Sequence, residues 1–167
     1  MNDEDVFQPD APGEFDHSFD YENYLAVLEP YRTELLGPIP EDPYPVRRWR
    51  WPDPLPYNGF TPIERIKFWQ RVCWAEANGA LLPCTKICSV CGSAQGVIGH
   101  AENYYDLTAA IPLCRACHFT VHTRFRQPSG WRRFQQRYAP SRGDKPWFCH
   151  LPYWQIDLAG YIRRNGD

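Results

Sequence analysis

The chain has 167 residues, 43% of them hydrophobic and 23% charged, with a formal net charge of −2. This length is enough for one ordinary domain and a tail, and the chain has no apolar run of about 18 residues, which excludes a transmembrane helix. Residues 1–5 are acidic, unlike a secretory signal, which begins basic and then turns apolar. We therefore expect a cytoplasmic protein with no membrane partner, in which paired cysteines bind metal rather than form disulfides.

Charge is divided unevenly along the sequence. Residues 1–43 hold twelve acidic residues against one basic residue, for a net charge of −11, whereas residues 44–167 hold 17 basic and eight acidic residues, for +9. A basic body attracts polyanions, most often nucleic acid. The acidic segment has two alternative roles: it neutralises the body and keeps it soluble, or it docks on a basic protein partner.

In chain order, residues 1–43 are predicted to form an acidic, partly disordered tail. A short helix is predicted within residues 21–36, with a break or kink at Pro30. Residues 44–60 are rich in proline and are predicted to be an extended wrap or linker.

The compact domain, residues 61–167, is predicted to open with a helix. Thr61 is suited to cap this helix, and Glu64 to complete a capping box. Asn78-Gly79 should end it.

Further along the domain, a short strand is predicted around residues 96–98, leading into His100. A helix should then carry His118 and His122, and Ser129 should cap another helix that ends at Ala139-Pro140. The aromatic, irregular residues 143–154 are expected to pack back on the domain.

Two Cys-x-x-Cys pairs stand out in the sequence: Cys88 with Cys91, and Cys114 with Cys117. Each pair places two sulfurs on one side of a tight turn, and two pairs complete a tetrahedral structural Zn²⁺ site. Gly92 follows the first pair and permits the positive φ that such a turn often needs. Cys84, four residues before Cys88, is an alternative ligand.

The stretch from Cys88 to His122 resembles the zinc-containing HNH family, whose fold is the treble clef or ββα-metal motif. His100-Ala101-Glu102-Asn103-Tyr104 is similar to the His-x-Glu-Asp-Tyr box of a subgroup common in phage and bacterial genomes, and Leu113-Cys-Arg-Ala-Cys-His118 with His122 is similar to the segment that follows that box. The resemblance covers about 35 residues. It implies an α+β fold, a small zinc-stabilised treble-clef (HNH-like) module with packing helices.

The resemblance also implies a divalent-metal-dependent endonuclease of a phage or defence system. In active members, a histidine on the first strand is the general base that takes a proton from water, and a metal ion held partly by a helix His or Asn stabilises the leaving oxygen. By this resemblance His100 is the candidate base, and His118 or His122 is the candidate ligand for Mg²⁺ or Mn²⁺. Glu102 and Asn103 are further candidates.

Two positions depart from the family pattern. Gly99 stands where many members have Asp or His, and Ala109 stands where members have Asn. A degenerate module that binds nucleic acid without cutting is therefore one alternative. A non-catalytic regulatory factor that binds a protein through its acidic tail is another. In those cases the three histidines are structural or solvated, and Glu102 pairs with an arginine.

Residues 115–142 contain seven arginines and no acidic residue, with aromatic residues interleaved. Arginine forks bind phosphate, and exposed aromatic rings stack on unpaired bases. We therefore expect DNA or RNA as a partner, with five candidate contacts: Arg124, Arg126, Arg132, Arg133 and Arg137. The alternative is a solvated arginine face over an aromatic core.

Overall fold

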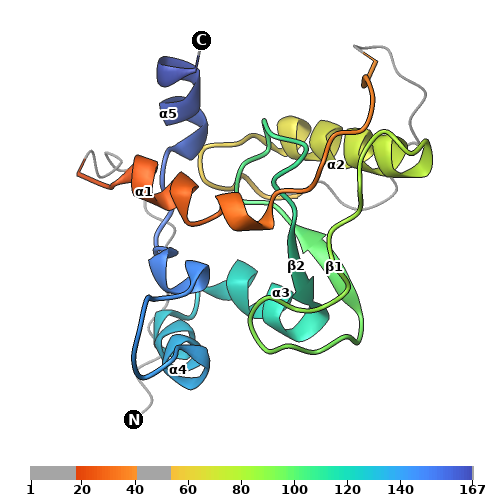
Figure 1. The fold of residues 1–167 in the computed structure, drawn as a ribbon. Coiled ribbons are helices and arrows are strands. Elements are labelled where there is room, and N and C mark those ends of the chain that lie inside the picture. The colour runs from red at the N-terminus through yellow and green to blue at the C-terminus, as the bar shows by residue number, and fades with distance from the viewer. Residues whose placement is uncertain (1–17, 41–53, 167) are drawn as a thin grey trace.

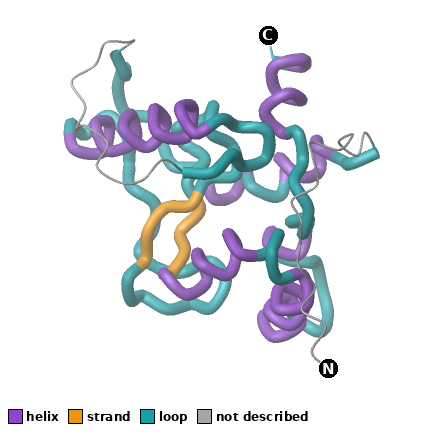
Figure 2. The backbone as a smooth tube through the Cα atoms, turned by 180° about the vertical axis from the view of Figure 1, so that it is seen from behind, coloured by secondary structure: helices purple, strands orange, loops and turns teal. Residues whose placement is uncertain are grey.

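The computed structural model describes residues 18–40 and 54–166. Their helices and strands are, in order, α1 (Tyr21–Ala26), η1 (Glu29–Tyr31), α2 (Pro62–Ala77), β1 (Val97–His100), β2 (Ile111–Cys114), α3 (Arg115–Thr123), α4 (Pro128–Tyr138), η2 (Trp147–His150) and α5 (Leu158–Asn165). The fold is α+β, as predicted. In both views α2 lies beyond one end of the two strands (Figures 1 and 2), and Figure 1 shows α3 beside the strands. No helix within these ranges is both long and apolar enough to span a bilayer.

The two strands form an antiparallel hairpin that places the candidate ligands. Val97 pairs with Cys114 at one end, and His100 pairs with Ile111 at the other. All four residues of β2 are buried, and α3 begins directly after Cys114. Because the rings of His118 and His100 are in contact, α3 runs from the cysteine end of the hairpin toward the His100 end.

Helix α2 has the ends that the sequence predicts. The Thr61 hydroxyl accepts a hydrogen bond from the Glu64 N–H, and the Glu64 carboxylate accepts one from the Thr61 N–H, which completes the capping box. Asn78 is the C-cap, and Gly79 follows with a φ of +68°. The start of α4 was predicted wrongly: Gln127 is the N-cap and Ser129 lies inside the first turn, because Pro128 already has the φ of a first helical residue.

The core begins earlier in the chain than Thr61, where the compact domain was expected to start. Tyr24, Tyr57 and Phe60 are buried, although the sequence places them in the tail and in the linker. Large aromatic side chains gain substantially from burial, which explains why these segments join the core. The remainder of the predicted tail and linker, residues 1–17 and 41–53, lies outside the described residues.

The C-terminal segment packs on the domain as expected. Trp147 and Phe148 are buried, and the Trp147 indole N–H donates to the Ser89 hydroxyl at 3.2 Å, within the first cysteine pair. Helix α5 was not predicted. Its N-cap is Asp157, whose carboxylate accepts from the Gly160 N–H at 2.9 Å.

Candidate metal centres

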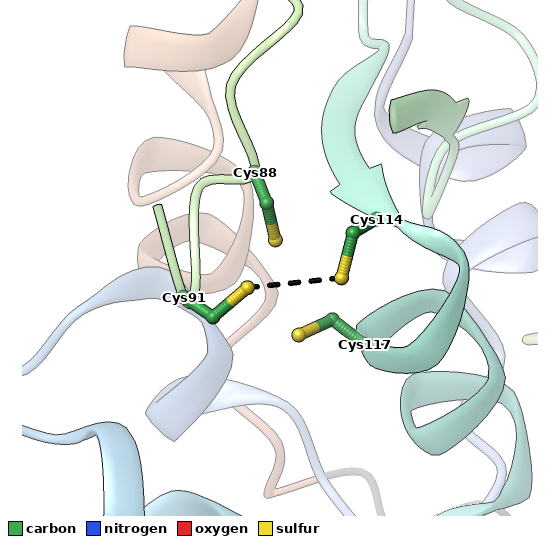
Figure 3. A group of neighbouring side chains, drawn as sticks. All are labelled: Cys88, Cys91, Cys114 and Cys117. Atoms are coloured by element: carbon green, nitrogen blue, oxygen red, sulfur yellow. Dashed lines mark hydrogen bonds between the residues drawn. The ribbon is translucent and has the colours of Figure 1, made fainter. Parts of the chain in front are cut away.

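Four cysteine sulfurs converge at the open end of the hairpin (Figure 3). The Sγ atoms of the set lie within 4.8 Å of one another: Cys88, Cys91, Cys114 and Cys117. The Sγ atoms of Cys91 and Cys114 are 3.7 Å apart, close to the edge of about 3.8 Å expected for a tetrahedron with Zn–S distances of about 2.3 Å. A disulfide, at about 2.05 Å, is excluded for this pair. The structure therefore brings the four predicted ligands together in a four-cysteine cluster that could hold a metal ion.

The first cysteine pair is shaped by a tight backbone turn. The Gly92 N–H donates to the Cys88 carbonyl at 3.0 Å, and Gly92 has the expected positive φ of 73°. Burial alone would raise the pKa of the Cys88 thiol, but the backbone N–H groups around its sulfur, first that of Cys91, lower the pKa to about 7. The turn therefore stabilises a thiolate at Cys88.

The second pair joins the hairpin to α3. Cys114 ends β2 and is the N-cap of α3, and Cys117 lies in the first turn of the helix. Burial and the neighbouring sulfurs raise the pKa of Cys117, since crowded thiolates repel one another unless a cation lies among them. Cys84, the alternative ligand, is buried but lies outside the cluster.

Three histidines converge at the other end of the hairpin. One ring nitrogen from each of His100, His118 and His122 lies within 4.8 Å of the others. The ring centroids of His118 and His122 are 4.5 Å apart, and those of His100 and His122 are 4.9 Å apart. The structure thus brings together all three histidines that the resemblance selects, with one from β1 and two that are one turn apart on α3.

The histidines on α3 are held in the form that binds metals. Burial, the largest cause, lowers the pKa of His118 to about 3 and that of His122 to about 2. Both imidazoles are therefore neutral near pH 7, and neutral imidazole is the ligating form. We refer to His100, His118 and His122 as the three-histidine cluster.

His100 is fully buried and is paired with a carboxylate. Its Nε2 lies 2.7 Å from Glu102 Oε1, and both side chains are 0% exposed. Its Nδ1 has no hydrogen-bond partner and is buried. A general base has to accept a proton from water, so this geometry does not support the role of base that the resemblance implied for His100.

Glu102 is surrounded by donors, which corrects its expected role near a metal ion. Oε1 accepts from the Tyr57 hydroxyl at 2.6 Å. Oε2 accepts from the Tyr24 hydroxyl at 2.5 Å, from Asn58 Nδ2 at 2.7 Å and from an Arg124 NH2 at 3.2 Å. Burial would raise the pKa of Glu102, but the charge of Arg124 and the hydrogen bond from His100 lower it below its usual range. Both oxygens are occupied, so Glu102 is a buried ion-pair residue, as one alternative reading of the sequence held.

Arg124 was predicted to contact nucleic acid, and this prediction is wrong. The side chain is 0% exposed. Besides Glu102, its guanidinium donates to the Tyr57 hydroxyl at 2.6 Å and to the carbonyls of Val121 and Pro152 at 2.9 and 2.8 Å. These bonds consume the donors that a phosphate would need. The other four candidate arginines are exposed: Arg126, Arg132, Arg133 and Arg137.

Asn103 takes part in a local turn rather than in the three-histidine cluster. Its Oδ1 accepts from the Tyr105 N–H at 2.9 Å, the pattern of an Asx-turn.

Sequence reasoning also missed the residues that surround Glu102. Tyr24, Tyr57 and Asn58 have no motif around them that signals a site.

Comparisons of the chain with protein-family models, curated proteins and solved structures find no significant match.

Proposed function

We propose that this protein is a zinc-stabilised, HNH-like protein that binds nucleic acid and cleaves it with the help of a second divalent metal ion. The observation that carries the proposal is the pair of clusters at opposite ends of one strand–strand–helix unit, β1-β2-α3. Four cysteines lie at the open end and three histidines near the turn. This arrangement is the one that the family resemblance implies for a ββα-metal motif.

The chemistry of the ligands decides which ions each cluster suits. Four thiolates are typical of structural Zn²⁺. Three imidazoles suit Zn²⁺, Co²⁺ or Ni²⁺, whereas Mg²⁺ prefers oxygen ligands, and no carboxylate completes the three-histidine cluster among the described residues. Of the two ions considered from sequence, Mn²⁺ therefore fits better than Mg²⁺. A divalent ion held there would stabilise negative charge on phosphate oxygens.

A groove between α3 and α4 supports nucleic acid as the partner. Its volume is about 560 Å³, and Phe119, Arg133, Arg137 and Tyr138 are among the residues that line it. Phe119 is 68% exposed, so its ring is available to stack on a base. Arg133 and Arg137 lie one turn apart on the exposed face of α4, so they can contact successive phosphates.

Replacing Arg132 and Arg133 with alanine should weaken nucleic-acid binding and reduce its dependence on salt. If both arginines contact phosphate, the slope of log K against log salt should become shallower by about 1.8 on duplex DNA. Fluorescence anisotropy with labelled single-stranded and duplex oligonucleotides measures this slope. The matched control is Arg163→Ala with Arg164→Ala, another adjacent pair of exposed arginines, on α5. Equal losses from the two pairs would contradict a specific role for α4.

Replacing His118 with alanine should abolish cleavage while leaving binding intact. The change removes one ligand of the three-histidine cluster but none of the four cysteines. The assay incubates zinc-loaded protein with plasmid, single-stranded DNA and RNA in the presence of Mn²⁺. His150→Ala is the control, because His150 lies outside the cluster. Cleavage that persists in His118→Ala would contradict the assignment.

Binding without cleavage is the second candidate function. Two observations favour it: His100 is fully buried, and both oxygens of Glu102 are occupied. Neither side chain is placed to take a proton from water. If the wild-type protein binds nucleic acid but does not cut it under any metal condition, this alternative replaces the nuclease. A protein partner for the acidic tail stays a prediction.

A further inference from the structure

We infer that Glu102 is a positioning residue: it holds His100 as the Nε2–H tautomer and so leaves Nδ1 of His100 as the nitrogen that binds a divalent cation. The inference deepens the proposed function and rests on it only in so far as the three-histidine cluster binds a metal ion. It concerns the tautomer of His100 in the protein before a metal ion binds at this cluster.

The first step is the charge state of Glu102, which follows from its neighbours. Asn58 Nδ2 and an Arg124 NH2 can only donate, and both approach Oε2. The Tyr57 hydroxyl accepts from Arg124 at 2.6 Å, so its own proton is directed to Glu102 Oε1. A carboxyl group that accepts from all of these donors has no need of a proton of its own, and Glu102 is therefore a carboxylate.

The second step is the position of the proton on His100. A carboxylate only accepts hydrogen bonds, so the contact of 2.7 Å between Nε2 and Oε1 requires Nε2 to donate. In the neutral imidazole that metal binding requires, the proton is then on Nε2, and the lone pair is on Nδ1. Buried polar atoms without a partner are rare and call for an explanation. The orphaned Nδ1 of His100 is explained if a cation lies beside it.

The third step is the rigidity of the arrangement. The donors to Glu102 come from three separate parts of the chain: Tyr24 from α1, Tyr57 and Asn58 from the segment before α2, and Arg124 from the C-terminal end of α3. Arg124 follows His122 by two residues, so the same network fixes the end of the helix that carries two of the histidines. Such outer partners orient a metal-binding histidine and strengthen metal affinity.

The test is Glu102→Gln in the full chain with zinc at the cysteines only, with Co²⁺ as the probe in isothermal titration calorimetry. The amide keeps the size of the side chain but presents an N–H where one oxygen accepts now. We expect Co²⁺ affinity at the three-histidine cluster to fall by about 10- to 100-fold. Asp106→Asn is the matched control, because Asp106 is a nearby carboxylate that pairs with Arg32 and not with His100. The Co²⁺ affinity of this variant should equal that of the wild-type protein. A folded Glu102→Gln protein with unchanged affinity would overturn the inference.

A second measurement is independent of whether Glu102→Gln folds. Nitrogen NMR of the histidine rings, on wild-type protein with zinc at the cysteines only, reports which nitrogen of His100 carries the proton. We expect the Nε2–H tautomer, and the Nδ1–H tautomer would overturn the inference. Neither measurement uses nucleic acid. If the proposed function is wrong, the protein will not bind or cleave nucleic acid. If this inference is wrong, Glu102→Gln will leave the Co²⁺ affinity unchanged, or His100 will carry its proton on Nδ1.

Discussion

Replacing Cys88 and Cys114 with serine should remove the metal ion from the four-cysteine cluster and unfold the hairpin and α3. The two substitutions delete one ligand from each pair. Metal binding at structural zinc sites supplies about 10–16 kcal/mol of apparent folding free energy, which is as large as the whole stability of a typical domain. Metal analysis should find about one zinc per wild-type chain and none in the variant, and far-ultraviolet circular dichroism should show the loss of structure.

The matched control changes two cysteines outside the cluster. Cys73→Ser with Cys149→Ser should retain zinc and helical signal, because neither residue belongs to the four-cysteine cluster. A strong chelator should reproduce the double-serine phenotype in the wild-type protein and leave no folded, metal-free species. A chain that stays folded without metal would contradict the structural role of the cluster.

Replacing Arg124 with alanine should destabilise the protein by about 3–5 kcal/mol, since it removes one partner of a buried ion pair and leaves the Glu102 carboxylate uncompensated. The Glu102 and Arg124 side chains are both 0% exposed, so water cannot take over the lost contact. Urea denaturation at neutral pH, followed by tryptophan fluorescence, measures the change in unfolding free energy.

The control for this prediction lies two residues further along the chain. Arg126 is exposed, and Arg126→Ala should change stability by no more than about 0.5 kcal/mol. Combining Arg124→Ala with Glu102→Gln should recover part of the loss, because the remaining partner is then neutral. If Arg124→Ala and Arg126→Ala lower the unfolding free energy equally, the buried Glu102–Arg124 pair contributes nothing to stability.

Features that depend on neighbouring residues could be predicted from sequence. The two Cys-x-x-Cys pairs, the positive φ at Gly92 and the capping box of α2 each follow from the chemistry of a few consecutive positions. The three histidines were selected by resemblance to a family pattern, and the structure brings them together. They lie together because the hairpin places His100 near its turn and α3 runs back toward it from Cys114.

The environment of Glu102 could not be predicted in this way. Its partner Tyr24 is 78 residues away in sequence, and Tyr57 is 45 residues away. Arg124 and Arg126 have the same chemistry and lie in the same basic segment, yet only Arg124 meets a buried carboxylate. Which arginine is buried depends on tertiary packing, and no local pattern encodes it. The same limit explains why the sequence predicts a linker before α2.

Helix α3 carries ligands of both clusters, with Cys117 and His118 adjacent in sequence and His122 one turn later. One rigid helix of this kind links the two binding equilibria, because an ion that orders α3 at the cysteines also prepares the histidines. Under the proposed function, zinc at the cysteines should therefore raise the affinity of the histidines for a second ion, and the second ion should raise the affinity of the cysteines for zinc by the same factor. A chain starved of zinc would then also bind the second ion weakly, so zinc supply would limit any chemistry at the histidines.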